Sequence, residues 1–235
     1  MNLAQAHFSH SKSRHMLLLR LSSRLMVAYD LSGKVAIVTG AGQGTGRAIA
    51  AALAAAGARV AVNDINPDRA YRVASELADT GGMARGIMAD VSNRFQCVHL
   101  IETSRAEWGQ IDLLVNCAAI APHAPMLKMD EWELMRVLDV NLKGVFFMCQ
   151  LVGRVMNDRY RIDGTRGVMI NLAGAEPEGA GQTAYAITQA ALPAFGRACA
   201  REYDPLGIDV HTLLVGASPE ETAAAVMKML GDSKQ

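Results

Sequence analysis

The stretch VTGAGQGTGRAIA, residues 38–50, decides the fold. It joins an apolar run of strand length, residues 34–39, to an alanine-rich helical pattern. Glycines between a strand and a helix let the backbone turn sharply and approach a pyrophosphate at the positive end of the helix. The stretch therefore predicts a dinucleotide-binding turn, and a glycine-rich connection without a ligand is the alternative. The glycines to which these roles are assigned are Gly40, Gly44 and Gly46.

Outward from this turn, short β-rich runs alternate with longer helical patterns along the chain. Continuous apolar strands that alternate with helices indicate a parallel sheet covered on both faces. We therefore expect an α/β domain, a Rossmann-type doubly wound parallel sheet of six strands in three α/β/α layers. The expected strands are 34–39, 59–64, 84–90, 111–119, 167–174 and 207–216. The expected helices are 46–58, 67–80, 95–109, 130–158, 183–204 and 218–230, with a kink at Pro193.

An acidic residue, Asp64, ends the second expected strand. A carboxylate there can accept hydrogen bonds from both ribose hydroxyls of an adenosine, and it would repel a 2′-phosphate. No arginine adjoins Asp64 in the sequence, although Arg47 and Arg69 are in the neighbourhood. The sequence therefore predicts NAD(H) in preference to NADP(H).

The composition indicates no partner beyond small molecules and other protein chains. The 23 basic and 23 acidic residues cancel, which gives no bulk attraction to nucleic acid. The cysteines form no CxxC pair, so we expect neither a disulfide framework nor a metal site, and a reducing cytoplasmic location is the default. The four cysteines are Cys97, Cys117, Cys149 and Cys199.

The first 29 residues differ from the rest, because they are basic and serine-containing and hold no acid. Their apolar run MLLLRL is too short to span a bilayer, so no membrane segment is expected. We expect an N-terminal extension over residues 1–29 and an NAD(P)-binding Rossmann domain over 30–235. An extension without function is one interpretation, and an organelle-targeting segment over residues 1–25 is the other.

Five motifs together resemble the short-chain dehydrogenase/reductase family and cover about residues 33–216 in the family's order. They are TGAGQGTG (39–46), DV (90–91), NCAA (116–119), DVNLKGVFF (139–147) and YAITQAAL (185–192). The resemblance implies that the turn holds the pyrophosphate, that 90–91 hold the adenine, and that an asparagine in the fourth helix helps to hold a proton-relay water. The implied cofactor-binding residues are Gly40, Gln43, Gly44, Thr45, Gly46, Asp64, Asp90, Val91, Asn116, Ala118, Tyr185 and Gln189, and the catalytic remnants are Asn141 and Tyr185.

The chain departs from the family pattern at two of the residues that carry the family's catalytic chemistry. The family usually reads NISS at the end of strand five, whereas this chain reads NLAG at 171–174, so Ala173 or Gly174 stands at the serine position. The family's lysine, four residues after the tyrosine, is Gln189, which brings no charge to lower the pKa of Tyr185. We therefore expect a neutral phenol near pH 7. The side chains weighed as substitutes are Thr183, Thr188, Glu176 and Glu178.

A second departure follows strand six. The family reads PG there and continues with a substrate-covering loop, further helices and a seventh strand. This chain reads Val215–Gly216, and residues 217–235 predict one helix. We therefore expect neither a seventh strand nor a substrate lid.

Three functions follow from these motifs. The first is an NAD(H)-binding protein with lost or much reduced oxidoreductase activity that acts as a subunit or regulator. The second is an active NAD(H)-dependent oxidoreductase that interconverts an alcohol and a ketone, and the third is a dimerisation scaffold with a vestigial pocket. The resemblance also implies a homodimer or homotetramer through helices near 130–157 and 183–204, or a hetero-oligomer with an active paralogue.

Overall fold

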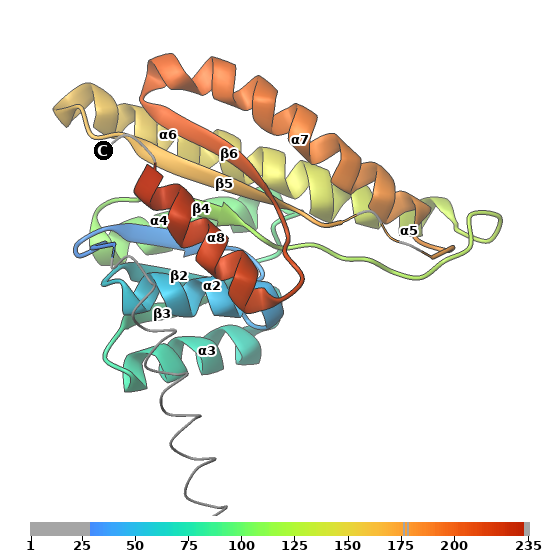
Figure 1. Ribbon diagram of the computed structural model, residues 1–235, viewed down its shortest axis with the longest axis horizontal. Helices are drawn as coiled ribbons and strands as arrows, with labels where there is room; N and C mark the ends of the chain where they lie inside the picture. Colours follow the sequence, from blue (N-terminus) through green and yellow to red (C-terminus); the bar gives the residue numbers. More distant parts are fainter. Residues whose placement is uncertain (1–28, 176, 178, 233–235) are drawn as a thin grey trace, which may run out of the picture.

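The computed structural model describes residues 29–175, 177 and 179–232, so residues 1–28 of the expected extension and both loop glutamates, Glu176 and Glu178, lie outside the described residues. The described chain forms one six-stranded parallel sheet in the order β3-β2-β1-β4-β5-β6 (Figure 1). This confirms the predicted doubly wound sheet. The strands are β1 (Val35–Val38), β2 (Arg59–Asp64), β3 (Met83–Met88), β4 (Leu113–Asn116), β5 (Gly167–Ala173) and β6 (Ile208–Leu214).

Helices cover both faces of the sheet, as the three-layer prediction requires. Figure 1 shows α2 and α8 side by side on one face and α6 behind the sheet on the other. The first face carries α2 (Gly44–Ala55), α3 (Pro67–Asp79) and α8 (Pro219–Asp232). The second carries α4 (Arg94–Trp108), α6 (Val145–Asp163) and α7 (Thr183–Tyr203), and the remaining elements are α5 (Glu131–Leu138), η1 (Asp139–Gly144) and η2 (Asp204–Leu206).

Strand β1 shows how the sequence places the two cores. All four of its side chains are fully buried. Ala36 and Val38 pack into the core under α2 and α8, while Ile37 packs into the opposite core under α4 and α6. Successive side chains of a strand point to opposite faces, so a strand with both faces covered must be apolar throughout. This is why β1 reads as an uninterrupted apolar run.

The start of α3 is set by its capping residues. The Asn66 side chain accepts a hydrogen bond of 3.0 Å from the Arg69 backbone N–H, and Pro67 occupies the first helical position. A capping asparagine followed by proline is a strong start signal for a helix. The cap turns the chain back on itself, so the third helical residue lies beside the end of β2.

One local expectation was wrong in detail. The single helix expected over 130–158 is interrupted by the π-helical segment η1, which carries Asn141, and the helical path runs on to Asp163. A π-helical turn inserts one residue and rotates the helix face, which a 3.6-residue pattern does not reveal. Pro193 lies inside α7 (Thr183–Tyr203), and the kink expected at this proline stays a prediction. Beyond β6, residues 219–232 form α8 and add no strand to the described sheet.

Candidate nucleotide-binding and catalytic site

A cleft of about 360 Å³ opens at the carboxyl ends of β1, β2, β3 and β4. This is the edge where doubly wound sheets bind ligands, because the chain order reverses between β1 and β4. Of the predicted cofactor residues, nine line this cleft: Gly40, Gln43, Gly44, Thr45, Gly46, Asp64, Asp90, Val91 and Ala118. Asn116, Tyr185 and Gln189 are outside its lining.

The glycine turn closes tightly on itself. Gly40 and Gly44 have φ values of +65° and +53°, a conformation that favours glycine. A Cβ on Gly40 would lie 2.8 Å from Ala118 Cα, and a Cβ on Gly46 would overlap the Gly40 carbonyl oxygen. Gln43 precedes α2 without a capping side-chain hydrogen bond. The first N–H groups of α2 are therefore available to an anion, so the turn fits the pyrophosphate of a dinucleotide.

Asp64 lies in the cleft wall with its side chain only 5% exposed. Its Oδ1 accepts hydrogen bonds from Arg69 Nη2 at 2.7 Å and Nε at 3.2 Å. Oδ1 also accepts from the Asn66 N–H at 2.9 Å, and Oδ2 accepts from the Gly42 N–H at 3.1 Å. No arginine is next to Asp64 in the sequence. In the folded structure, however, Arg69 contacts Asp64 directly, so the expectation that no arginine adjoins this acid is wrong. The Asn66–Pro67 helix cap is the feature of the sequence that could have predicted the contact between Arg69 and Asp64.

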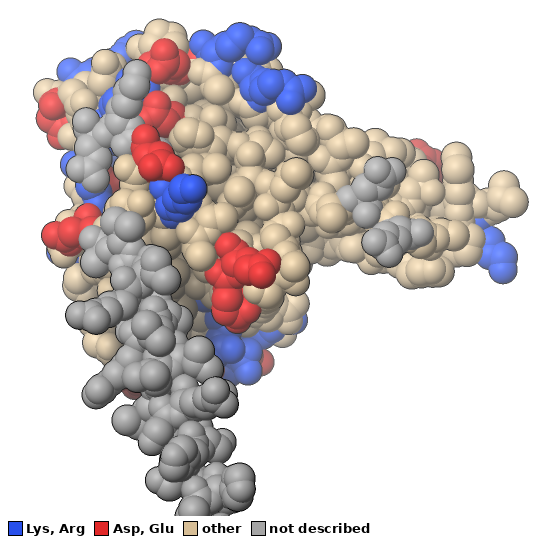
Figure 2. Space-filling model, in the orientation of Figure 1, with Lys and Arg blue, Asp and Glu red and all other residues tan. Residues whose placement is uncertain are grey.

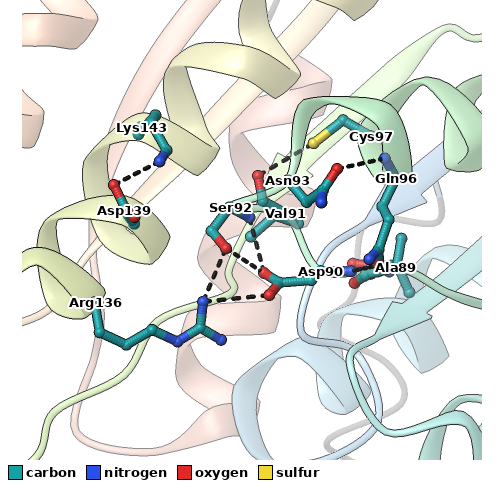
Figure 3. A network of polar contacts seen from close by, with 11 residues as sticks. Ala89, Asp90, Val91, Ser92, Asn93, Gln96, Cys97, Arg136, Asp139 and Lys143 are labelled. Atoms are coloured by element: carbon teal, nitrogen blue, oxygen red, sulfur yellow. Dashed lines mark hydrogen bonds and ion pairs between the residues drawn. The ribbon is translucent and has the colours of Figure 1, made fainter. Parts of the chain in front are cut away.

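Asp90 belongs to a second charged group, which reaches from the loop after β3 to α5 (Figure 3). Its Oδ1 accepts from Ser92 N–H at 2.9 Å and Ser92 Oγ at 2.7 Å, and its Oδ2 accepts from Arg136 Nη1 at 3.2 Å. Burial alone would raise the Asp90 pKa, but the bonds from Ser92 and Arg136 outweigh it, and the pKa lies below its usual range. The carboxylate therefore stays ionised and fixed. No sequence motif indicated Arg136.

Asn116 positions the loop after β4 from inside the core. Its Nδ2 donates to Asn171 Oδ1 at 2.8 Å, and its side chain is buried. The next two residues donate their N–H groups to Thr39 Oγ1, Cys117 at 3.0 Å and Ala118 at 3.1 Å. The hydroxyl of Thr39 therefore holds the loop against the glycine turn. Sequence reasoning missed this role of Thr39, although it opens the quoted motif.

Asn141 is held by backbone on one side and by α7 on the other. Its Oδ1 accepts from Ile120 N–H at 2.9 Å, and its Nδ2 donates to the Ile120 carbonyl at 2.9 Å. The same Nδ2 donates to Thr188 Oγ1 at 3.1 Å. The asparagine thus joins the loop after β4 to the tyrosine helix, and its implied part in holding a proton-relay water stays a prediction.

The oxygen and the nitrogen of the Gln189 side-chain amide both form hydrogen bonds. Its Oε1 accepts from the Gly174 N–H at 2.7 Å, and its Nε2 donates to Thr188 Oγ1 at 3.1 Å. The side chain is buried and uncharged. It therefore ties α7 to the end of β5, and one amide hydrogen is left for another acceptor.

Tyr185 places its hydroxyl over the end of β5. A Cβ on Gly174 would overlap the Tyr185 hydroxyl, so the phenol occupies the space that a side chain at 174 would need. Burial raises the pKa of Tyr185 above its usual value. The phenol is therefore protonated near pH 7. Of the proposed substitute hydroxyls, Thr188 is committed to internal bonds and Thr183 is exposed on the same helix.

We expect Thr188 to stabilise the fold, because its hydroxyl forms hydrogen bonds with Asn141, Tyr185 and Gln189. It is fully buried and its Oγ1 donates to the Tyr185 carbonyl at 2.7 Å while accepting from Asn141 and Gln189. Thr188→Val keeps the shape of the side chain but leaves buried N–H donors of Asn141 and Gln189 without their acceptor. We expect this to lower the free energy of unfolding by about 1–3 kcal/mol. Urea denaturation measures the loss. Thr183→Val, at an exposed site on the same helix, should stay within about 0.5 kcal/mol, and an equal loss in both variants would contradict the assignment.

Catalysis by a thiol or by a metal ion has less support in the described residues. Cys117 lines the cleft, but burial raises its thiol pKa to about 12, which makes it a poor nucleophile. Within residues 29–175, 177 and 179–232, no group of three or more His, Cys, Asp or Glu side chains could hold a metal ion. None of the helices in this part of the chain is long and apolar enough to cross a bilayer.

The doubly wound sheet, the glycine turn and the tyrosine helix define a dinucleotide-binding oxidoreductase fold of the Rossmann type. The family model for short chain dehydrogenase matches residues 34–229, and the chain belongs to the short-chain dehydrogenase/reductase family. The chain is 35% identical over 198 residues to D-threitol dehydrogenase of Mycolicibacterium smegmatis, covering 82% of this chain and 74% of that protein.

Two solved structures of the same fold hold different cofactors. A 7α-hydroxysteroid dehydrogenase complexed with NADH and 7-oxo glycochenodeoxycholic acid has a TM-score of 0.77 and 27% identity, covering 85% of this chain and 88% of that one. A metagenomic short-chain oxidoreductase in complex with NADP has a TM-score of 0.78 and 27% identity, covering 87% and 92%. The family therefore binds a nicotinamide cofactor, in either the phosphorylated or the unphosphorylated form.

Proposed function

We propose that this chain binds NAD(H) and interconverts an alcohol and a ketone, at a rate below that of family members with the full catalytic set. The observation that carries the proposal is the position of the Tyr185 hydroxyl over Gly174, at the carboxyl end of β5. The related proteins named above are dehydrogenases and oxidoreductases, which supports turnover.

Each part of the site has a role in this reaction. The N-terminus of α2 binds the pyrophosphate. The nicotinamide, when bound, supplies the hydride to the ketone carbon. Tyr185 donates its phenolic proton to the ketone oxygen during reduction and takes a proton from the alcohol during oxidation. Asn141 holds α7 against the loop after β4, and so keeps Tyr185 in place.

The preference for NAD(H) follows from Asp64. Its Oδ2 accepts one hydrogen bond, from Gly42 N–H, and a carboxylate oxygen can accept a second. A ribose hydroxyl fits that acceptor, whereas a 2′-phosphate would meet a like charge.

The second candidate function is an NAD(H)-binding subunit without turnover. Gln189, which stands at the family's lysine position, adds no positive charge beside Tyr185, whose pKa is raised by burial. A weak proton donor lowers the rate of carbonyl reduction. The same residues would then retain the cofactor for a structural or regulatory purpose.

Calorimetric titration with NADH, paired with a screen of alcohols and ketones, tests these functions. The expected result is NADH binding with slow, measurable turnover. Binding without turnover on any substrate would favour the second candidate. A chain that neither binds nor turns over would be a dimerisation scaffold with a vestigial pocket, contrary to the proposal.

The pH dependence should separate the two directions of the reaction. Reduction uses the neutral phenol, so its rate should stay flat from about pH 6 to pH 9, below the raised pKa of Tyr185. Oxidation uses the phenolate, so its rate should rise about tenfold per pH unit over the same range. Initial rates in both directions measure this. An oxidation rate that levels off near neutral pH would indicate another base.

We also propose that the chain forms a homodimer or homotetramer through α6 and α7. On the face that Figure 2 shows, few charged side chains lie at the end of the molecule that carries α5 and the start of α7. Phe146 on α6 and Ile187 on α7 are 48% and 52% exposed. Apolar patches of this kind mark association surfaces.

Phe146→Asp should shift the mass in light scattering toward the monomer, because it places a charge in the apolar contact. Phe95→Asp is the control, because Phe95 is exposed on α4 rather than on α6 or α7, and it should leave the mass unchanged. A monomeric unmodified chain would contradict the proposal.

A further inference from the structure

A second groove, of about 860 Å³, runs along α2 on the face of the sheet opposite α4 and α6, and we call it the α2 groove. On this face α2 lies between α8 and α3 (Figure 1). Arg47 is the one charged residue in positions 44–55. A helix side that faces water ordinarily carries charged and polar residues, so this side of α2 is suited to being covered. The floor of the groove consists of Ala48, Ala51, Ala54 and Ala55.

The charged side chains that line the α2 groove are more acidic than basic. They are Glu76 of α3, Glu220 at the start of α8, and Arg47. Arg47 pairs with Glu76 at 2.8 Å, whereas no ion pair joins the exposed Glu220 to another described residue. The excess carboxylate favours a basic occupant of the groove.

The first described residues lie at the end of the α2 groove where α2 stops. The Leu31 N–H donates to the Ala56 carbonyl at 2.8 Å. Ser32 packs on Gly57, since a Cβ on that glycine would lie 2.9 Å from Ser32 Oγ, and Gly57 itself lines the groove. The chain that precedes Tyr29 therefore starts within a few residues of this end of the groove.

The segment that comes before Tyr29 has the composition that the groove favours. Residues 16–28 lie outside the described residues, and their sequence is MLLLRLSSRLMVA, with two arginines and no acid. Leu17, Leu21 and Leu25 recur at every fourth position, the spacing of side chains on one side of a helix. At about 1.5 Å per residue, the 12 residues of α2 span about 18 Å and a helix of residues 16–28 would span about 20 Å. Length, apolar spacing and charge therefore all match the groove.

We infer that residues 16–28 dock in the α2 groove of the same chain. The three leucines cover the alanine floor, and the arginines face the carboxylates of Glu76 and Glu220. Gly44 lines both this groove and the nucleotide cleft, so the docked segment supports the helix whose first N–H groups face the pyrophosphate position. The extension then has a structural role in the domain, which differs from both an extension without function and a targeting segment.

Thiol labelling with a maleimide tests the inference in the full chain. Ala51→Cys places a thiol on the floor of the groove, and peptide mass measures the label at that position separately from the four native cysteines. Changing Leu17, Leu21 and Leu25 to serine in the same chain should raise the labelling rate at least about tenfold, because the apolar contacts that hold the segment in the groove are lost. Circular dichroism of both chains confirms that they are folded.

The charges of the groove are tested in the same way. Glu220→Lys, added to Ala51→Cys, should raise the labelling rate about two- to fivefold, because it reverses a charge that attracts the basic segment. Adding Arg20→Glu to that chain should lower the rate again. A rate that Glu220→Lys leaves unchanged would contradict the placement of the arginines.

Ala106→Cys is the control, because Ala106 is exposed on α4, on the opposite face of the sheet. Its labelling rate should be the same with and without the three leucines. Equal rates at position 51 in the two chains, whether fast or slow, would overturn the inference. Slow labelling that becomes fast when the protein is diluted would mean that a second copy supplies the segment, which would also overturn it. Labelling requires neither NADH binding nor turnover, so the result is independent of the proposed function.

Discussion

Gly46→Ala is expected to abolish measurable NADH binding, with a loss of at least about 100-fold, which corresponds to about 2.7 kcal/mol. A Cβ at this position would overlap the Gly40 carbonyl oxygen and lie 3.0 Å from Ala41 Cα. Both neighbours are backbone, so the turn has to open to admit the methyl group. Opening it moves the first N–H groups of α2 away from the pyrophosphate position. Calorimetric titration with NADH measures the effect.

The same substitution should also destabilise the fold by about 1–3 kcal/mol, the usual cost of overpacking. Gly33→Ala is the matched control, because Gly33 has a φ of +79° and open space around its Cβ position. It should lose about 1–2 kcal/mol from backbone strain and bind NADH normally. Unchanged NADH affinity in Gly46→Ala would contradict the assignment of the turn.

Tyr185→Phe should lower turnover by at least about 100-fold, because it removes the proton-transfer group of the proposed reaction. NADH affinity should change little, since Tyr185 is outside the cleft lining. The ring also keeps its packing over Gly174. Initial rates and NADH titration on the same preparation separate the two effects.

Tyr71→Phe removes a hydroxyl of the same kind from an exposed position on α3. It should leave both turnover and NADH affinity unchanged. Equal turnover in the unmodified chain and in Tyr185→Phe would show that the tyrosine carries no chemistry, and the reaction would then need another proton donor.

The candidate site was predictable where local backbone conformation defines it. The glycine turn is a contiguous motif whose residues impose their own geometry, so Gly40, Gly44 and Gly46 line the cleft as expected. Asp90 and Val91 follow β3 after one intervening residue, and parallel strands bring their carboxyl ends to one edge of the sheet. Their positions in the sequence were therefore sufficient to predict that these residues line the cleft.

The contacts that tune the site were not predictable in the same way. Arg69 reaches Asp64 only because the α3 cap reverses the chain, and Arg136 reaches Asp90 across 46 positions of sequence. Thr188 joins Asn141 to Gln189 because the π-helical segment η1 faces α7 at that point. Each contact depends on the direction of a side chain after the helices have packed.

The sequence by itself determined the six-stranded parallel sheet, its order of elements and the place of the nucleotide cleft. Those features follow from hydrophobic period and turn chemistry, which act over a few neighbouring residues. Only the tertiary structure decided that Asp64 shares its charge with Arg69 and that the Tyr185 hydroxyl fills the space beside Gly174. Both depend on distances between elements, which are set when the two cores pack on the sheet and close the spaces between side chains.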